Sequence, residues 1–508
     1  MNRTRMLNRA AALLALAGAA ALAHAQTEAA PAPAAAPATA APAVAPTAAA
    51  PDQPGAKPAL EPGVTPAPVA KAKPVAKPKP GAKPKPDTMP SPQPARKDIV
   101  LDAAPAATQA PEAARTHAGA AQAIAAHDLD TSGALAELGL GLLRQRSAGS
   151  GDAQANAVVS PFSLASALGM LHAGTEGAGA RELALLLGSQ GARLYTTRLP
   201  DLSGRIAAPG KDGLPFVMAN RVWIDAGVVG AVPRSYSAAV ARRYKADGAL
   251  VTFAKANEAR AAINGWVARQ TANRIEELMP EGSVGPNTKV VLTNAIHFKS
   301  PWEDQFDPAK TVAKPFHLAG GAPKDVPTMV DEREVLMGTV DNVSIMQLPF
   351  AGNAFALLVG MPPQGHTLNA FETDLKGRDF ATWSAALKPS RCRLELPKFT
   401  IAPAAHPLKA SLQALGVNTV FGQNANLGPM LGKSAKGVYL DNVFQSATVI
   451  IDEQGGEAAA ATGAATTAKS FSMPAPVCAL NRPFIFALVH RASGTPIFMG
   501  KVADPCLR

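Results

Sequence analysis

Residues 452–470 read DEQGGEAAAATGAATTAKS, and this stretch guides the interpretation of the whole chain. Between Glu457 and Lys469 lie eleven small uncharged residues. Their composition alone predicts an exposed, flexible linker. A strand inside a sheet, however, buries every second side chain, and the alternate set here is Gly456, Ala458, Ala460, Thr462, Ala464 and Thr466. All six are small, so the same stretch is also suited to enter a sheet beneath a covering helix.

The segments around this stretch show helical and strand periodicity. Apolar residues at helical spacing predict helices at Leu135–Arg146, Phe162–His172, Arg181–Leu187, Tyr236–Tyr244, Glu258–Leu278 and Leu408–Leu415. Short apolar or alternating runs predict strands at Phe216–Ile224, Lys289–Phe298, Ser344–Leu348, Phe355–Val359, Arg393–Phe399, Tyr439–Ile451, Phe484–Val489 and Ile497–Val502. Helices dominate the first half and strands the second, which predicts an α+β fold with large sheets rather than a doubly wound fold.

Composition divides the chain into two parts. The 508 residues include 46 prolines, of which 21 fall between residues 27 and 126. Residues 1–126 hold 13 basic and 7 acidic side chains, so only +5 of the net charge of +11 belongs to residues 127–508. A nucleic-acid interface needs a basic folded face, so we expect no nucleic-acid partner. Residues 127–508 are predicted to form one domain, because no second linker interrupts them.

The N-terminus predicts an export signal. Three arginines within the first nine residues precede an apolar run from Ala10 to Leu22, and Ala23 and Ala25 then place small residues at the two positions that a signal peptidase reads. A run of about 13 residues is shorter than the roughly 20 needed to span a bilayer. We therefore prefer a signal peptide at residues 1–25 to an N-terminal anchor helix. The mature protein is expected to be soluble and exported, either periplasmic or secreted.

Residues 26–126 are predicted to be a disordered linker. From residue 27 to 114 the sequence is mainly alanine, proline and lysine, which cannot bury a core. Repeated proline favours an extended conformation and spaced lysines repel one another, so we expect a semi-rigid cationic spacer. Two roles stay open for it. We favour a solvated tether over a weak contact of its lysines with anionic envelope polymers.

Motifs for catalysis and metal binding are missing from the sequence. Gly432-Lys433-Ser434 resembles the end of a phosphate-binding loop, but Leu427 stands where the motif requires glycine. No Gly-x-Ser-x-Gly, His-Glu-x-x-His or Cys-x-x-Cys motif occurs, so we predict no catalytic residue, metal or cofactor. The three cysteines, Cys392, Cys478 and Cys506, allow one disulfide with one thiol left over.

Six motifs resemble the serpin family and occur in the family's order. They are NAVVSPFS at 156–163, NAIHFK at 294–299, LPKF at 396–399, DEQGGE at 452–457, NRPFIF at 481–486 and FMGKV at 498–502. The resemblance covers essentially all of residues 127–508. It implies a serpin fold with large, mostly antiparallel sheets, about eight to nine helices and an exposed reactive-centre loop. It also implies a monomeric suicide inhibitor, not an enzyme, that traps a serine protease as a covalent acyl complex while its cleaved loop inserts into a sheet.

The resemblance places the reactive bond. Seventeen residues counted inclusively from Glu453 end at Lys469, so the expected bond is Lys469–Ser470. A lysine there suits the acidic specificity pocket of a trypsin-like protease, with cysteine proteases as secondary targets. A shift of one residue would instead offer Ala468 to an elastase-like protease, and a solvated loop lysine is the alternative without function.

The resemblance also assigns the supporting residues. The hinge is Glu453, Gly455, Gly456, Glu457, Ala458, Ala459, Ala460 and Ala461. The shutter beneath the opening sheet includes Ser160, Ser163 and Asn294, the breach where insertion begins contains Trp302, and Lys398 pairs with Glu453. Gln445 stands where the family often has histidine, and its amide both donates and accepts hydrogen bonds.

One hinge residue departs from the family pattern. Gly456 stands where serpins usually have threonine or serine, and together with Gly463 it is expected to weaken the inserted strand. Slower insertion would favour hydrolysis over trapping.

Two other functions stay open. One is a non-inhibitory, serpin-fold binding or chaperone-like envelope protein, against which the small hinge alanines argue. The other is an envelope-interaction protein whose cationic linker is the functional part, in which case deletion of residues 27–114 would abolish function.

Overall fold

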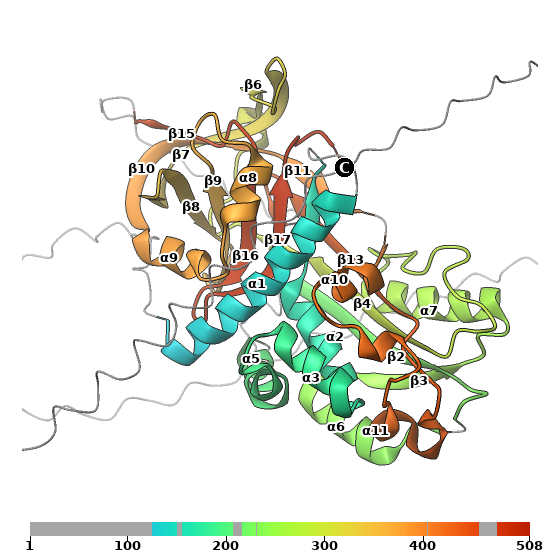
Figure 1. Ribbon diagram of the computed structural model, residues 1–508. Coiled ribbons are helices and arrows are strands. Elements are labelled where there is room, and N and C mark those ends of the chain that lie inside the picture. Colours follow the sequence, from blue (N-terminus) through green and yellow to red (C-terminus); the bar gives the residue numbers. More distant parts are fainter. Residues whose placement is uncertain are drawn as a thin grey trace, which may run out of the picture. The chain divides into compact units, whose positions relative to one another are not determined.

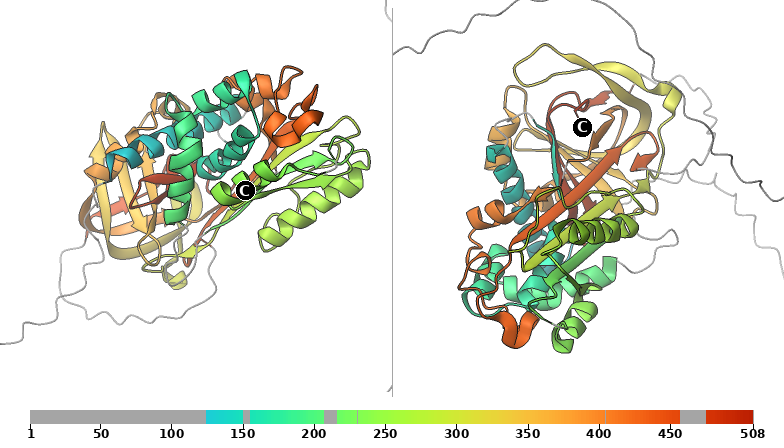
Figure 2. Two further views of the ribbon diagram at one scale, coloured as in Figure 1. Left: turned by 90° about the horizontal axis from the view of Figure 1, so that it is seen from below. Right: turned by 90° about the vertical axis from the view of Figure 1, so that its right-hand side faces the viewer.

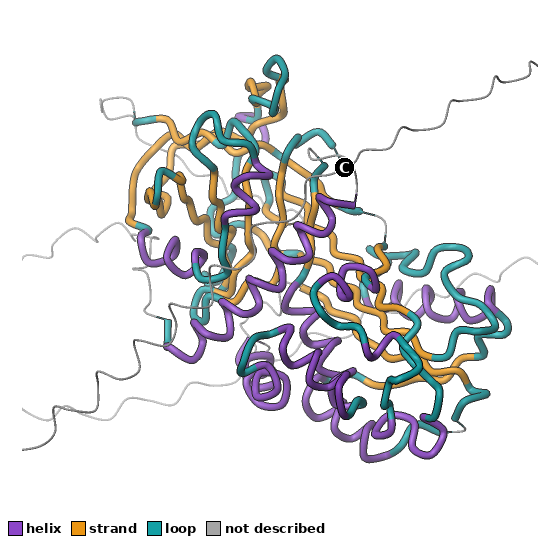
Figure 3. Tube along the Cα trace, in the orientation of Figure 1, coloured by secondary structure: helices purple, strands orange, loops and turns teal. Residues whose placement is uncertain are grey.

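The computed structural model describes residues 124–149, 155–206, 216–229, 231–403, 405–456 and 475–507. These residues form an α+β fold with two large sheets (Figures 1 and 3). Within them lie eleven α-helical segments, nine of which have six or more residues, so the predicted fold class is confirmed. The predicted signal peptide and almost all of the predicted linker lie outside the described residues. None of the described helices has the length and apolar character needed to cross a bilayer.

The larger sheet has nine strands in the order β1-β17-β16-β9-β8-β7-β10-β15, with β6 paired to β7. Its strands are β1 (Ala157–Val159), β6 (Val312–Phe316), β7 (Lys324–Val340), β8 (Val343–Pro349), β9 (Phe355–Met361), β10 (Lys388–Pro397), β15 (Val477–Ala479), β16 (Phe484–His490) and β17 (Thr495–Val502). All pairs are antiparallel except β10 with β15. Every residue of β9 is buried, as its unbroken apolar sequence predicts for a central strand.

The smaller sheet has six strands in the order β11-β13-β4-β2-β3, with β12 also paired to β13. Its strands are β2 (Phe216–Asp225), β3 (Asp247–Val251), β4 (Val290–Phe298), β11 (Phe399–Ile401), β12 (His406–Pro407) and β13 (Asn442–Ile451). The two central strands, β4 and β13, are parallel neighbours, paired from Val291 with Asn442 to His297 with Thr448.

Both faces of the smaller sheet are covered, which explains why all nine residues of β4 are buried. On one face Leu292 and Ile296 join the main core with helix α2 (Pro161–Ala173). On the other face Val291 and Ala295 join a second core with helix α7 (Ala256–Gln270). The left view of Figure 2 shows α7 on the opposite side of this sheet from the other helices. Any strand added to the sheet must therefore pass beneath α7.

The other helices pack mainly against the main core. They are α1 (Ala126–Gly149), α3 (Gly177–Leu186), α4 (Gly191–Arg193), α5 (Leu199–Ile206), α6 (Arg234–Tyr244), α8 (Leu368–Asp374), α9 (Asp379–Ala386), α10 (Lys409–Ala414) and α11 (Gly428–Leu431).

The predicted helix from Glu258 to Leu278 is wrong at its C-terminal end. Helix α7 ends at Gln270, because Ala272 and Asn273 take left-handed backbone angles, with φ of 50° and 60°. The helical spacing of apolar residues continues to Leu278 because the following loop folds back onto the helix. There the side chain of Asn264 accepts hydrogen bonds from the backbone N–H groups of Leu278 and Met279 at 3.1 and 2.8 Å.

Two predicted strands also have corrected boundaries. The strand predicted from Tyr439 begins at Asn442, because Tyr439 to Asp441 form the approach to β13. The strand predicted over Arg393–Phe399 breaks at Lys398, so that β10 remains in the larger sheet and β11 joins the smaller one.

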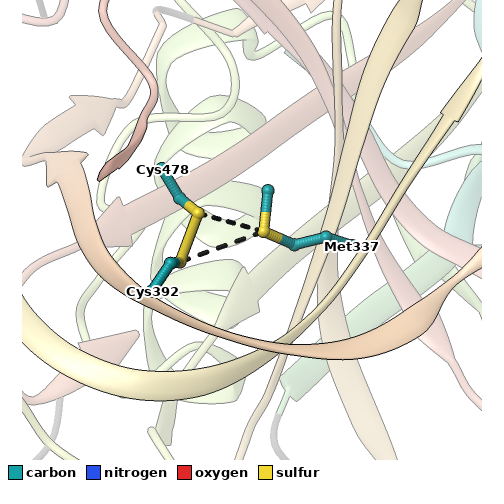
Figure 4. The surroundings of a disulfide bond; sticks show 3 residues. All are labelled: Met337, Cys392 and Cys478. Atoms are coloured by element: carbon teal, nitrogen blue, oxygen red, sulfur yellow. Dashed lines mark hydrogen bonds between the residues drawn. A yellow bond between two sulfur atoms is a disulfide. The ribbon is translucent and has the colours of Figure 1, made fainter. Parts of the chain in front are cut away.

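A disulfide between Cys392 and Cys478 joins β10 to β15, with their Cα atoms 6.0 Å apart (Figure 4). Met337 of β7 packs against it, and its sulfur lies 3.1 Å from the Cys478 sulfur and 3.9 Å from the Cys392 sulfur. Cys506 is an exposed free thiol. The pairing left open by the sequence is thus assigned in the structure.

Candidate functional site

A tight turn follows the end of β13. The backbone N–H groups of Asp452 and Gly455 each donate to the other residue's carbonyl oxygen, at 3.0 and 3.2 Å. The Asp452 carboxylate accepts further hydrogen bonds from the backbone N–H groups of Gln454 and Gly455, at 2.9 and 3.2 Å. This Asx-type arrangement reverses the direction of the chain within four residues.

The reversed chain re-enters the sheet as β14 (Gly455–Gly456), which pairs antiparallel with β5 (Ser300–Pro301) just after β4. On its other side Gly455 forms an antiparallel bridge to Asp452 at the end of β13. A strand that enters between two parallel neighbours runs either parallel or antiparallel to both, and the chain reversal at residues 452–455 makes it antiparallel. Residues 455 and 456 already have this direction at the end of the β4–β13 pair.

Both hinge glycines are required by the space around them. Gly455 has φ of +130°, and a Cβ atom there would lie 2.3 Å from the carbonyl oxygen of Ser300. A Cβ atom at Gly456 would lie 2.4 Å from the ring of Phe298. That ring has little freedom, because it is buried against Phe350 at 4.7 Å between ring centres. Glycine at 456 therefore lets the chain enter between Phe298 and the backbone of β13.

Trp302 supports the turn from the side of β5. Its indole N–H donates to the carbonyl of Asp452 at 2.8 Å, and its backbone N–H donates to the carbonyl of Gln454 at 2.9 Å. The ring stacks on Phe350 with centres 4.5 Å apart, and only 2% of the residue is exposed. Trp302 thus combines a rigid apolar base with two hydrogen bonds to the hinge turn.

Glu453 forms the charged contact of the hinge. Its carboxylate accepts hydrogen bonds from Lys398 Nζ at 2.7 and 3.0 Å and from Thr311 Oγ1 at 2.7 Å. Burial raises the pKa of Glu453, but the hydrogen bonds from Lys398 and Thr311 outweigh it, so the net pKa lies below the ordinary value for glutamate. The carboxylate is therefore ionised at neutral pH and fixes the turn to the start of β11.

A row of buried amides crosses the middle of the smaller sheet. Asn220 of β2, Asn294 of β4 and Gln445 of β13 lie side by side in the strand register. The Asn294 side chain donates to Asn220 Oδ1 at 2.5 Å, and Gln445 Nε2 donates to Asn294 Oδ1 at 2.5 Å. A strand inserted between β4 and β13 would have to break the Gln445–Asn294 bond.

The amide row is tied to the N-terminus of α2. The Ser160 hydroxyl caps this helix by accepting from the Ser163 backbone N–H at 3.2 Å, and it donates to the carbonyl of Ile497 at 2.6 Å. Asn294 Nδ2 also donates to Ser163 Oγ at 2.5 Å, and Gln445 Nε2 to the carbonyl of Ser160 at 3.2 Å. The structure thus brings Ser160, Ser163, Asn294 and Gln445 into one buried network.

Helix α7 is held over the sheet by an arginine between two tryptophans. The guanidinium of Arg221 on β2 lies 4.2 Å from the ring centre of Trp266 on α7 and 5.2 Å from that of Trp223. Asp247 of β3 binds the same guanidinium through two hydrogen bonds of 2.6 Å. These contacts must loosen before α7 can move away from the sheet.

Several predicted residues lie outside the described residues: Glu457, the four alanines Ala458 to Ala461, and the reactive bond Lys469–Ser470. The described chain resumes after them and leads into β15.

The contributors to the site that were missed from the sequence include Asn220, Thr311 and Phe298. Asn220 is a polar residue inside an apolar strand, and that break in the pattern was the one available signal. In the described part of the chain no group of three or more histidine, cysteine, aspartate or glutamate side chains is arranged to hold a metal ion.

Comparison with known proteins adds four findings. A family model described as Serpin (serine protease inhibitor) matches residues 134–505. The leukocyte elastase inhibitor of Bos taurus is 31% identical over 369 residues, which cover 69% of this chain and 93% of that protein.

Among solved structures, mouse protein-Z dependent protease inhibitor matches with a TM-score of 0.65 and 24% identity, covering 75% of this chain and 98% of that one. A thyroxine-binding globulin in complex with thyroxine matches with a TM-score of 0.66 and 24% identity, covering 74% and 99%. These two similarities concern the fold.

Proposed function

Because this chain belongs to the serpin family, we propose that it is a suicide-substrate inhibitor of trypsin-like serine proteases. The serine of the protease would attack the carbonyl carbon of Lys469, forming an ester as the peptide bond to Ser470 breaks and the Ser470 amine leaves. The loop up to Lys469 would then insert between β4 and β13 with the protease still attached.

One observation carries this proposal: β14 already runs in the direction of an inserted strand. Gly455 and Gly456 are bonded between the end of β13 and β5, and the chain beyond them continues with alternating small residues. Insertion would extend an antiparallel pairing that is already present, so no separate nucleation step is needed.

The free energy gained by strand insertion is large enough to distort an attached protease. About a dozen new strand residues at roughly 0.5–1.5 kcal/mol net per hydrogen bond supply on the order of 10 kcal/mol. The same residues, at ~3.4 Å each, carry the attached protease about 40 Å along the sheet. Stabilisation of this size competes with the marginal stability of a protease domain. The uncleaved form is then metastable and is maintained by a kinetic barrier.

The barrier has two identifiable components. The sheet opens only if Gln445 and Asn294 separate, which removes the donor from the buried Asn294 Oδ1 at a cost of about 1–3 kcal/mol. The inserting strand must also lift α7, which is held by Arg221 and Trp266. Once the new strand is in place, its hydrogen bonds replace those between β4 and β13, and the contacts of α7 can re-form.

We further propose that the chain is exported and that residues 26–126 act as a cationic tether. A disulfide in a large domain is typical of an oxidising compartment, which supports export. The tether needs no role in inhibition itself, so a variant lacking residues 27–114 is expected to inhibit as well as the full chain does.

Incubation with trypsin tests the proposal. We expect a complex that survives heat and detergent, together with a C-terminal fragment that begins at Ser470 after reduction. Lys469→Ala should abolish this complex, whereas Lys436→Ala, a lysine outside the loop, should leave it intact. Trypsin with a blocked active-site serine should form none.

Other outcomes would redirect the assignment. Cleavage at Lys469 without a complex would make the protein a substrate, and the non-inhibitory binding function would then be preferred. A complex with elastase and a fragment beginning at Lys469 would move the reactive bond to Ala468.

A further inference from the structure

Strand β15, at the C-terminal end of the loop, is weakly bonded but covalently fixed. It has three residues and lies at the edge of the larger sheet. Its pairing with β10 includes hydrogen bonds from Arg393 N to the Pro476 carbonyl and from Leu480 N to the Glu395 carbonyl, both 2.9 Å. A few such bonds contribute only about 0.5–1.5 kcal/mol each. The Cys392–Cys478 disulfide, by contrast, holds β15 in place even when these hydrogen bonds break.

We propose that this disulfide makes cleavage of the loop a precondition for its insertion. The inference rests on the proposed function, because it assumes that residues beyond Gly456 enter the sheet between β4 and β13. It adds that the uncleaved loop is prevented from entering by its own C-terminal anchor.

The length of the chain carries the argument. Residues 457–469 number thirteen, and as a strand at ~3.4 Å each they extend about 44 Å from Gly456 along the sheet. In an uncleaved chain the next residues must return to Cys478. This residue pairs with Leu394 of β10, shortly before Lys398 reaches Glu453, so it lies at the end of the sheet where the loop would enter. Residues 470–477 number eight and span at most about 29 Å when fully extended. Full insertion and an anchored Cys478 are therefore incompatible until the chain is cut.

Partial insertion is also limited. The whole segment from 457 to 477 has 21 residues. In an uncleaved chain these residues must run along the sheet from Gly456 and then return the same distance to Cys478. No more than about ten of them can enter the sheet before the return segment is taut. An incomplete strand of this length gains correspondingly fewer hydrogen bonds.

Without the disulfide this limit disappears. If β15 separates from β10, the return segment extends to the start of β16 at Phe484. Residues 470–483 number fourteen and reach about 48 Å, enough for the 44 Å return. The uncleaved loop is then long enough to insert fully, which would consume the inhibitor without a protease.

The disulfide has a second consequence after cleavage. Residues 470–508 become a separate polypeptide, which Cys478 still links covalently to Cys392 in the body of the protein. The fragment should therefore stay attached during denaturing electrophoresis without reductant. Dithiothreitol would release it by supplying two electrons and two protons to the disulfide and leaving as its own cyclic disulfide.

The test compares three uncleaved proteins at a temperature below that of unfolding. They are the wild type, the double variant Cys392→Ser/Cys478→Ser, and Cys506→Ser. The last is the control, because it removes a cysteine outside the disulfide. Intact mass, trypsin inhibition and resistance to urea are followed over time. We expect the double variant to lose inhibition and gain urea resistance at full mass at least tenfold faster than the other two. Equal rates for all three, including no conversion in any, would overturn the inference.

A cleaved sample separates this inference from the proposed function. Wild type cut at Lys469 should become resistant to urea while its disulfide is intact. If it does not, the loop does not insert at all and the proposed function fails. If it does, the comparison of the uncleaved proteins decides the role of the disulfide. Should the double variant not fold, dithiothreitol added to folded Cys506→Ser replaces it, and this protein without reductant is the reference.

Discussion

The two ends of the loop are held by different kinds of bonds. At the N-terminal end, Gly455 and Gly456 are held by backbone hydrogen bonds, with one ion pair at Glu453. At the C-terminal end, β15 has a similarly short backbone pairing but also a buried disulfide. Hydrogen bonds exchange for equivalent ones as a strand advances, whereas a disulfide does not. If the loop inserts as proposed, this difference means that it can advance only from its N-terminal end.

This asymmetry gives each end a separate role. The N-terminal end lies at the β4–β13 junction in the direction of insertion, so it supplies the driving force. The C-terminal end limits how far the uncut chain can reach, so it sets the timing. Three further predictions concern the N-terminal end, while the disulfide test addresses the other.

The largest effect is expected from a charge on the inward face of the inserting strand. Ala460 belongs to the alternate set that includes Gly456, whose Cβ atom would face Phe298, so Ala460→Arg would place a guanidinium in the main core. Burial of an unpaired charge costs several kcal/mol, enough to stop insertion at that point. We expect the number of inhibitor molecules consumed per trypsin trapped to rise at least tenfold, measured by titration of residual trypsin activity.

Ala461→Arg is the matched control for this prediction. Its side chain would lie on the α7 face of the strand, where a long side chain can carry its guanidinium past the single covering helix to solvent, so inhibition should fall much less than for Ala460→Arg. If the two variants exchange their effects, the strand register is shifted by one residue. If both inhibit normally, the loop does not insert as a strand.

A smaller effect is expected from Gly455→Ala. The new methyl group would meet the Ser300 carbonyl oxygen, and φ of +130° is unfavourable for any residue with a Cβ atom. The combined strain is about 1–3 kcal/mol, which should detach β14 from β5. We expect the urea concentration at the midpoint of unfolding to fall, and the amide hydrogens near residue 455 to exchange faster.

Gly365→Ala separates the two causes of that strain. Gly365 also has a positive φ, of +88°, but no atom lies within 4 Å of a Cβ atom there. Its substitution should lower the free energy of unfolding less than the substitution of Gly455 does, and it should leave hydrogen exchange at the hinge unchanged. Equal effects of the two substitutions would show that contact with Ser300 contributes nothing.

The sequence predicted most of the framework because its pattern is local. Buried strands such as β9 and β16 have unbroken apolar sequences, and the segment that forms α2 follows a serine cap and a proline. In contrast, the 17-residue strand β7 was missed. Many of its residues are polar and only partly buried, and it pairs with β6 at one end, with β10 along its middle and with β8 at the other end, so neither strand period nor apolar content marks it.

The contacts of the site depended on information that is not local. The pairing of Cys392 with Cys478 follows from the parallel register of β10 and β15, which joins residues 86 apart in the sequence. Asn220 enters the amide row only because β2 lies beside β4. Gly456 was expected from composition to weaken the inserted strand. In the structure its missing side chain is what allows the chain to pass Phe298.

The smallest effect is expected from Glu453→Gln, and it should depend on pH. The folded protein lowers the pKa of Glu453, so the ion pair with Lys398 stabilises the hinge above the unfolded pKa of about 4.3 and is lost as pH falls through the lower folded value. At pH 7 the variant should lose about 1 kcal/mol or less, because Lys398 is partly exposed. Urea unfolding of both proteins from pH 7 to pH 3 should show this difference in unfolding free energy shrinking below pH 5.

Glu258→Gln, which removes an exposed pair with Lys255, is the control and should have little effect at pH 7. A difference that stays constant down to pH 3 would mean that Glu453 acts through shape rather than charge. Because a disulfide does not titrate in this range, the fragment beyond residue 470 should stay attached at every pH, so acid would loosen only the N-terminal end of the loop.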